Sequence, residues 1–472
     1  MAKSNEQAQK PKKIMFNPYV LVILSFIVVI GIGSFLLTIP FAQTSGKWGS
    51  YIDSLFIAVS ATCVTGLCTY ADGIGNTLTF FGQLVVMVMI QIGGLGFVTV
   101  LTFFITLIRS KLEFRDRYFI SQMVGSTNFA DVVKFVRKLI LISLIAEVTG
   151  FLLGLPVFFQ MFPDNKLLAL WYSLFTSVSA FNNAGFDLFG SLSLIRDAAN
   201  PLIYDLPAWA YYYMCSYIMI LIVSGGISFL VILDVFSFKK FRQYRVFSKI
   251  VLATTATLLV GGTLIFILSE VTTGGMTVFD ALFQSVTLRT AGFATYNQDN
   301  ITMVGKVFSC LLMFIGGSPL STAGGIKTTT IFMIFLAMFC YFRGKPVVAF
   351  KRKYSSNMIV RAMSLAFLGL FAAVIGFVLL SSFERNNALI GNPNFNTDDP
   401  AALIYEVFSA FGTVGVSVGI TPLLSTGSKI VLCFLMFLGR LGPITFLQIF
   451  QANMDKKQSL HYEYVEEDFL IG

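Results

Sequence analysis

Long apolar runs dominate the hydrophobic pattern of the chain. Several runs contain the roughly 20 apolar residues that a helix needs to cross the hydrocarbon core of a bilayer, about 30 Å thick. The pattern predicts eight membrane-spanning helices, at 18–40, 79–108, 138–162, 208–236, 247–270, 303–316 continued by 329–342, 358–382 and 428–450. The predicted fold class is therefore an all-α integral membrane protein.

A shorter, partly apolar segment lies in four of the connections between these runs. The segments read FIAVSATCVTGL (56–67), FTSVSAFNNAGF (175–186), FQSVTLRTAGF (283–293) and YEVFSAFGTVGV (405–416). Each begins with an aromatic residue, has Ser or Thr four positions later, and reaches a glycine after nine or ten positions. The hydroxyl residues are Ser60, Ser179, Thr287 and Ser409, and the glycines are Gly66, Gly185, Gly292 and Gly415.

The recurrence of these segments, about 116 residues apart, predicts four copies of one unit. Each unit contains a spanning helix, a short re-entrant pore helix, a glycine turn and a second spanning helix, an arrangement abbreviated M1-P-M2. The predicted boundaries are an N-terminal tail (1–17), four repeats (18–117, 118–245, 246–357 and 358–454) and a C-terminal tail (455–472). The polar N-terminal residues are followed by no cleavage site, so we expect the first span to be retained.

The short segments favour cation conduction around a central pore. Ten to twelve residues cannot cross a bilayer, and irregular backbone at that depth is tolerated only inside protein or beside a water-filled cavity. The C-terminal end of a short helix carries a partial negative charge that favours a cation. A glycine turn allows backbone carbonyl groups to face the axis and replace the hydration shell of an ion. A purely structural role, in which the glycines only end re-entrant hairpins, remains the alternative.

Charged residues make up only 12% of the chain, against 56% hydrophobic residues, and this composition excludes a soluble protein. Lys and Arg cluster at 3–13, 109–117, 134–138, 239–249, 343–361 and 456–457. An even number of spans places these clusters on one side, which the positive-inside rule makes the cytoplasm, with both termini there. The acids of the opposite loops either concentrate cations at the outer mouth or merely fill loops that exclude bases.

The net charge of +9 does not indicate nucleic-acid binding, because the basic residues are dispersed among short loops. The six cysteines lie mostly in apolar segments without metal-ligand spacing, so we interpret them as small hydrophobic residues. An enzyme in the membrane would need a constellation of nucleophile, base or metal ligands within the spans. Away from their ends the spans contain no histidine and a single carboxylate, so the sequence does not favour an enzyme.

Several motifs resemble those of the Trk/Ktr/HKT superfamily of K⁺ and Na⁺ transporters, and the Ktr-type membrane subunit most of all. They are NNAGF (182–186), RTAGF (289–293), GGSPLSTAGGIKTTT (316–330) and SAFGTVGVSVG (409–419). The resemblance implies eight spans in four M1-P-M2 units and a homodimer in a bacterial cell membrane. It also implies K⁺ as the transported ion, promotion by Na⁺, and regulation by a separate cytoplasmic ring of nucleotide-binding, RCK-type subunits.

Carried onto this chain, the resemblance assigns four filter walls, which we call the wall segments. They contain Thr62, Cys63, Val64, Thr65 and Gly66; Asn182, Asn183, Ala184 and Gly185; Arg289, Thr290, Ala291 and Gly292; and Gly412, Thr413, Val414 and Gly415. Only the glycine recurs in all four, so we expect fewer carbonyl rings than in a potassium channel. Gly66, where a serine accompanies Na⁺ transport in plant relatives, favours K⁺. We expect Arg289 to brace its wall from behind by pairing with a carboxylate.

The resemblance also implies a gate below the filter, in the Gly/Ser/Thr-rich segment 316–327. The predicted gate residues are Gly316, Gly317, Ser318, Gly324, Gly325, Lys327 and Arg440. Arg440 is expected to hydrogen-bond carbonyl groups of the segment and to repel cations. A kinked helix is the structural alternative. Glu147, a carboxylate within a span, is expected to pair with Arg289 or Lys327 or to lie protonated between helices.

Two functional hypotheses remain open, a gated K⁺ uptake protein and a freely conducting cation channel, and the segment 316–327 favours the first. The chain has no GxGxxG nucleotide motif between a strand and a soluble helix, so we expect nucleotide sensing on another chain. The basic cytoplasmic loops and residues 462–472 are the predicted docking surface for that partner, unless the tail is simply disordered.

Overall fold

The computed structural model describes residues 18–96, 132–237, 241–385 and 400–442, and regular structure in these ranges is nearly all helical. The one sheet within them is an antiparallel hairpin of β1 (Val348–Ala349) and β2 (Arg352–Lys353). The prediction of a mainly helical fold is confirmed. The predicted tails, 1–17 and 455–472, lie outside the described residues.

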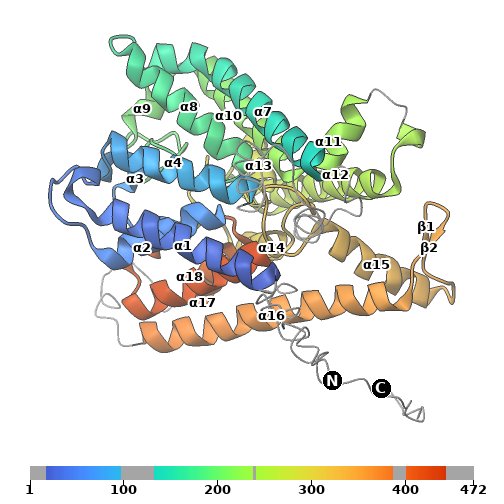
Figure 1. Cartoon of the computed structure of the whole chain (residues 1–472). Coiled ribbons are helices and arrows are strands. Elements are labelled where there is room, and N and C mark those ends of the chain that lie inside the picture. Colours follow the sequence, from blue (N-terminus) through green and yellow to red (C-terminus); the bar gives the residue numbers. More distant parts are fainter. Residues whose placement is uncertain (1–17, 97–131, 238–240, 386–399, 443–472) are drawn as a thin grey trace, which may run out of the picture.

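The helices follow one another in four groups (Figure 1). Group one contains α1 (Pro18–Thr38), η1 (Pro40–Ala42), α2 (Tyr51–Cys63), α3 (Gly73–Thr77) and α4 (Phe80–Leu95). Group two contains α7 (Val132–Met161), α8 (Lys166–Asn182), α9 (Pro201–Tyr204), α10 (Ala208–Gly226) and α11 (Phe229–Phe236). Group three contains η2 (Phe241–Gln243), α12 (Val246–Phe266), η3 (Ile267–Val271), α13 (Val278–Thr287), η4 (Gln298–Asn300), α14 (Met303–Phe314) and α15 (Thr328–Phe342). Group four contains α16 (Ser356–Glu384), α17 (Pro400–Gly412), η6 (Thr421–Leu423) and α18 (Thr426–Leu441).

Four helices in the described ranges are long and apolar enough to cross a membrane by themselves. They lie within Val136–Met161, Ala208–Gly226, Val246–Val271 and Ser356–Glu384. Phe367 and Phe371 are examples of large apolar side chains exposed on α16, as a lipid-facing helix requires. The predicted spans 79–108 and 428–450 begin in α4 and α18, and their remaining residues lie outside the described ranges.

The predicted continuous span at 208–236 is wrong, because α10 ends at Gly226 and α11 begins at Phe229. The backbone N–H groups of Ser318 and Thr322 donate to the carbonyl groups of Gly226 and Gly225, at 3.1 and 3.3 Å. Contacts from group three therefore satisfy the last carbonyl groups of α10, which a continuing helix would use itself. The predicted interruption at 316–327 is confirmed, since it lies between α14 and α15.

The helices α2, α8, α13 and α17, which precede the recurrent glycines and which we call the short helices, are linked into a closed ring by the helices that follow the glycines. The helix after the glycine in each group packs against the short helix of the next group: α4 on α8, α10 on α13, α14 on α17, and α18 on α2. The last contact joins the two ends of the described chain, and Figure 1 shows α2 in blue beside α18 in red. The four groups therefore surround one axis.

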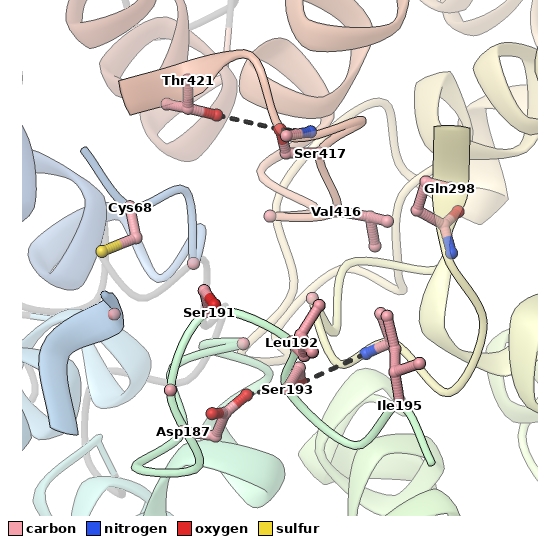
Figure 2. A pocket seen from close by; sticks show the side chains of 18 of the residues that line it. Cys68, Asp187, Ser191, Leu192, Ser193, Ile195, Gln298, Val416, Ser417 and Thr421 are labelled. Carbon is pink, nitrogen blue, oxygen red and sulfur yellow. Dashed lines mark hydrogen bonds between the residues drawn. The ribbon is translucent and has the colours of Figure 1, made fainter. Parts of the chain in front are cut away.

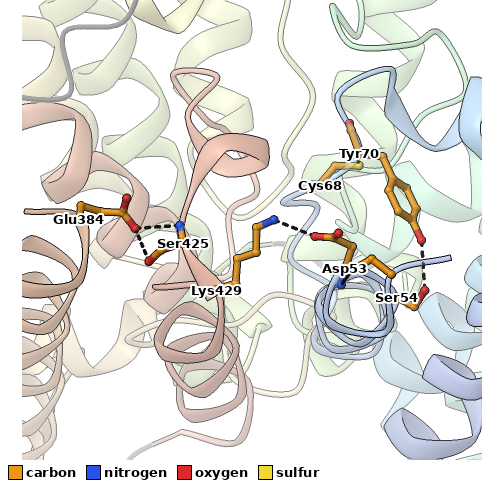
Figure 3. A network of polar contacts seen from close by, with 8 residues as sticks. Asp53, Ser54, Cys68, Tyr70, Glu384, Ser425 and Lys429 are labelled. Carbon is orange, nitrogen blue, oxygen red and sulfur yellow. Dashed lines mark hydrogen bonds and ion pairs between the residues drawn. The ribbon is translucent and has the colours of Figure 1, made fainter. Parts of the chain in front are cut away.

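An ion pair connects the first and fourth groups (Figure 3). The ammonium group of Lys429 on α18 lies 2.8 Å from a carboxylate oxygen of Asp53 on α2, and both side chains are largely buried. Beside it, Glu384 accepts hydrogen bonds from the backbone N–H and the hydroxyl of Ser425, the residue that caps α18. These contacts fix the start of α18 where the ring closes.

Candidate ion pathway and filter

Each short helix is followed by a residue with positive φ and then, two positions later, by a glycine that also has positive φ. The non-glycine residues are Val64 (φ 58°), Asn183 (58°), Thr290 (73°) and Thr413 (52°). The glycines are Gly66 (φ 103°), Gly185 (70°), Gly292 (86°) and Gly415 (90°). Left-handed backbone is costly for β-branched residues such as valine and threonine, so the surrounding structure imposes it. All four wall segments share this turn.

The recurrent hydroxyl residues hold the backbone around the glycines. Ser60 and Ser409 accept the N–H groups of Gly66 and Gly415, each at 3.1 Å. Ser179 and Thr287 instead donate to the carbonyl groups of the residues after their glycines, Phe186 at 2.5 Å and Phe293 at 2.6 Å. The hydroxyl group five or six positions before the glycine therefore stabilises each turn, which explains its recurrence in the sequence.

The four glycines close a ring in which each faces a carbonyl group of the next wall segment. A Cβ atom on Gly66 would lie 2.6 Å from the carbonyl oxygen of Ala184. The same atom on Gly185 or Gly292 would lie 2.8 Å from the carbonyl oxygen of Ala291 or Val414, respectively. A Cβ on Gly415 would overlap the carbonyl oxygen of Thr65 and complete the cycle. Each of these carbonyl groups belongs to the residue just before a glycine.

Backbone oxygens around one axis can replace the water molecules around a monovalent cation. Thr62 and Asn182 lie in the last turns of α2 and α8, and their side chains donate to the carbonyl groups of Ala58 and Val178, one helical turn earlier. Cys63 packs in the hydrophobic core, and Gly412 is the last residue of α17. The backbone from the left-handed residue to the glycine is therefore the part nearest the axis.

A pocket of about 400 Å³ lies on one side of the ring (Figure 2), and all four glycines line it. Its other lining residues come from the stretches that follow the glycines, and within the described chain they include Asp187 and Asp299 but neither Lys nor Arg. The residues two positions after the glycines, Cys68, Asp187, Ala294 and Ser417, all line the pocket. This spacing is the sequence signal that locates the pocket, whereas from the sequence we considered only that acids of the outer loops gather at a mouth.

Asp187 is the largely buried acid of this pocket, with 8% of its surface exposed. Its carboxylate accepts hydrogen bonds from the Ser193 hydroxyl and from the N–H of Phe189. Burial raises the pKa of Asp187 to about 6, although these two donors act in the opposite direction. The pocket therefore contains a carboxyl group that titrates close to neutral pH.

The segment 316–327 lies on the opposite side of the ring, against residues that precede the glycines. The hydroxyl group of Thr322 donates to the carbonyl groups of Phe181 and Gly225, at 3.3 and 3.0 Å. A Cβ atom on Gly325 would lie 3.2 Å from the carbonyl oxygen of Gly412. The segment is held at its base by the N–H of Gly316, which donates to the carbonyl of Ile326 at 2.9 Å. It therefore forms a compact loop beneath the wall segments.

Two cationic side chains donate hydrogen bonds to carbonyl groups of this loop, Arg440 from α18 and Lys327 from the loop itself. The Arg440 guanidinium donates to the carbonyl groups of Thr322 in the loop and of Gly93 and Gly94 at the end of α4. The predicted contact between Arg440 and carbonyl groups of the loop is thus confirmed. The ammonium group of Lys327 donates to the carbonyl oxygen of Ala323 within the loop, at 2.7 Å.

The carboxylate partner predicted for Arg289 is wrong, and of the two alternatives for Glu147 the structure shows the position between helices and not a basic partner. The Arg289 guanidinium donates at 3.2 Å to the backbone carbonyl of Thr255 on α12, and no carboxylate of the described chain forms an ion pair with it. Arg289 therefore anchors the third wall segment to a helix backbone. Glu147 binds neither Arg289 nor Lys327 but accepts from neutral side chains on three helices. Side-chain partners of this kind depend on helix packing, which hydropathy does not specify.

Comparison with known proteins identifies what this architecture is similar to. The TrkH family model, described as a cation transport protein, matches residues 1–462. The Potassium/sodium uptake protein NtpJ of Enterococcus hirae is 34% identical over 471 residues, covering 97% of both chains. The Ktr system potassium uptake protein B of Bacillus subtilis is 34% identical over 463 residues, covering 96% of both. The crystal structure of the potassium transporter TrkH from Vibrio parahaemolyticus shares the fold, with a TM-score of 0.65 at 17% identity, over 93% of this chain and 86% of that one.

Proposed function

The chain belongs to the TrkH family of cation transport proteins, and we propose that it carries K⁺ across a bacterial cell membrane as the translocating subunit of a Ktr-type uptake system. Its relatives are transport proteins and not enzymes. Potassium appears in the names of several of them. The observation that carries the proposal is the ring of glycines and carbonyl groups, which offers a dehydrated cation four equivalent backbone positions.

We further propose that the four helix groups are four M1-P-M2 units with the predicted repeat boundaries, and that the wall segments form one selectivity filter. The pocket lined by Asp187 would be the outer mouth, and both termini would be cytoplasmic. The acidic character of the pocket supports this orientation, since negative charge at the entrance raises the local concentration of cations.

The loop 316–327 is the proposed gate, with Arg440 holding it beneath the filter. Thr322 carries the link, because its hydroxyl reaches the end of α8 while its carbonyl group accepts from Arg440. A loop held by hydrogen bonds to three separate helices can move as a unit when those bonds are exchanged. This geometry favours gated uptake over free conduction. Promotion by Na⁺, a homodimer in the membrane and a cytoplasmic nucleotide-binding regulatory ring belong to the same proposal. The Ktr system names of two relatives support the presence of a partner subunit.

A filter substitution tests the proposal. Gly66→Ser adds a side chain whose Cβ would lie 2.6 Å from the carbonyl oxygen of Ala184, so the K⁺ over Na⁺ preference should fall by about tenfold or more. Gly31→Ser is the matched control, because a Cβ on Gly31 in α1 meets no atom within 4 Å. The measurement is K⁺ uptake into proteoliposomes with competing Na⁺. Lack of K⁺ accumulation by the wild type under a fixed gradient would reject the function, and an unchanged preference in Gly66→Ser would reject the filter.

A further inference from the structure

Glu147 on α7 is a carboxylate within a membrane-spanning helix, with only 5% of its surface exposed. Three neutral side chains donate to it. The Gln91 amide lies 2.9 and 3.1 Å from its two carboxylate oxygens, the Ser143 hydroxyl 2.8 Å and the Asn182 amide 3.1 Å from one of them. Every partner is a donor, as a carboxylate requires.

No basic side chain of the described chain forms an ion pair with Glu147. A carboxylate without a counter-charge is expensive to bury, and only its hydrogen bonds offset that cost. An apolar residue would be cheaper at the same place in a span. A costly group that is retained in the membrane is a candidate for function.

One of the donors to Glu147, Asn182, belongs to the predicted filter. Asn182 is the last residue of α8 and directly precedes Asn183, the left-handed residue of the second wall segment. The Asn182 amide also donates to the side-chain oxygen of Gln91, at 3.0 Å. Gln91 lies in the last turns of α4, which end at Leu95. Glu147, Gln91 and Asn182 therefore form one buried network between α7, α4 and α8.

A second contact ties Glu147 to the same short helix. The Ser177 hydroxyl on α8 donates to the backbone carbonyl of Glu147 at 2.6 Å. In group three the equivalent serine, Ser285, donates to the backbone carbonyl of Leu259 at 2.9 Å. The residue that corresponds to Glu147 in group three is thus an apolar leucine. The attachment of a short helix to its neighbour therefore does not require a carboxylate. The hydrogen bond from Asn182 to the Glu147 carboxylate is an additional contact of the second wall segment, and leucine cannot form it in group three.

We propose that Glu147 is a positioning residue that sets the ion preference of the pathway by holding the second wall segment. Its carboxylate fixes the Asn182 side chain, and Asn182 fixes the turn that presents the Ala184 carbonyl toward Gly66. Gln91 connects the same network to the end of α4, whose Gly93 and Gly94 carbonyl groups accept from Arg440. This inference rests on the proposed function and adds a determinant of selectivity outside the wall segments.

The experiment compares Glu147→Ala and Glu147→Gln in full-length protein reconstituted in proteoliposomes, with K⁺ uptake measured against competing Na⁺ and Rb⁺. Glu147→Ala removes one of the three acceptors of the Asn182 amide and the charged group of the network, and the K⁺ over Na⁺ preference should fall about tenfold. Glu147→Gln keeps one oxygen acceptor and should lose less. Glu270→Gln is the matched control, because Glu270 is equally buried but accepts only from Thr302 at the start of α14. Its preference should not change.

A double-mutant cycle with Asn182→Ala separates positioning from general destabilisation, since two residues in one network give non-additive losses of preference. Wild-type preference in folded Glu147→Ala, or additive losses in the cycle, would overturn the inference while K⁺ uptake by the wild type still supports the proposed function. If Glu147→Ala does not fold, Glu147→Gln decides, and an unchanged preference in that variant overturns the inference equally. Absence of uptake by the wild type would instead reject the proposed function itself.

Discussion

Group three differs from the other three helix groups in the way the helix after its recurrent glycine meets the wall segments. In groups one, two and four, a glycine of that helix lies against the carbonyl group of the residue two positions before the left-handed turn. The three pairs are Gly93 with Thr62, Gly225 with Phe181 and Gly439 with Phe411, and a Cβ on any of these glycines would overlap the carbonyl oxygen. Backbone therefore packs directly on backbone in these groups.

In group three, the glycine that corresponds to Gly93, Gly225 and Gly439 is Gly316, which follows α14. A Cβ on Gly316 would overlap the carbonyl oxygen of Gly324 in the loop 316–327. The wall segment is also one residue shorter. The N–H of Ala291 donates to the carbonyl of Thr287, four residues earlier, whereas the N–H of Thr65 reaches Ser60, five residues earlier. Groups one, two and four are thus fixed to their wall segments by close backbone contact. In group three, the loop 316–327 takes the place of that contact. Movement in this pathway is expected where that contact is missing.

The largest expected effect is at the close contacts. Gly225→Ala forces a Cβ against the carbonyl of Phe181, where neither backbone can yield, and should destabilise the protein by about 3 kcal/mol and abolish uptake. Gly261→Ala on α12 is the control, since its Cβ meets nothing within 4 Å and should be neutral or slightly stabilising. The thermal midpoint of purified protein in detergent measures both. Equal midpoints for the two variants would show that the close contact has no structural importance.

Changes in the loop 316–327 should raise K⁺ uptake, whereas Gly225→Ala should abolish it. Deleting 317–324, or changing Arg440 to alanine, removes the obstruction or the side chain that holds it, and should raise K⁺ flux roughly fivefold or more with the filter preference retained. Dependence on the regulatory partner should weaken at the same time. Flux into proteoliposomes at a fixed K⁺ gradient measures the effect. Loss of flux in both variants, in protein that still folds, would make the loop a brace and place the gate elsewhere.

The smallest effect concerns the pocket, where groups two and three differ again. Two positions after the glycine, group two has Asp187 and group three has Ala294. With a pKa raised by burial to about 6, Asp187 is charged above that pH and neutral below it. The K⁺ concentration for half-maximal uptake should therefore rise about threefold as the pH falls through 6.

Asp187→Asn should remove this pH step, while Asp299→Asn, another acid of the pocket, should leave the step in place. Initial rates of uptake over a pH series between 5 and 8 measure both variants, with the internal pH held constant. A step that persists in Asp187→Asn would assign the titration to a different group.

The sequence predicted the features that repeat. The recurrence of Ser60, Ser179, Thr287 and Ser409 before the glycines located four turns that share two positions with positive φ. The hydrophobic pattern also placed most helices, because apolar length alone determines whether a segment can span a bilayer. The assignment of the wall segments as a K⁺ filter and of the loop as its gate stays a prediction.

The features that do not repeat were predicted poorly. The break between α10 and α11 depends on a loop almost 100 residues later, whose N–H groups occupy the last carbonyl groups of α10. Glu147 finds its partners on helices 35 and 56 residues away, and Arg289 finds a backbone carbonyl 34 residues away. Hydropathy and local motifs carry no information on the rotation of one helix against another, and these contacts depend on that rotation. Only packing in three dimensions fixes them.

The ion pair between Asp53 and Lys429 has a consequence for biosynthesis. The two residues are 376 positions apart, so α2 enters the membrane long before its partner helix exists. At about 5–20 residues per second, a ribosome needs roughly 20–75 s to bridge that distance. During this interval the first unit lacks the neighbour that covers one of its sides, and the face of α2 beside Asp53 must be shielded by lipid or by the insertion machinery. Completion of the pathway therefore waits for the last helix to be translated.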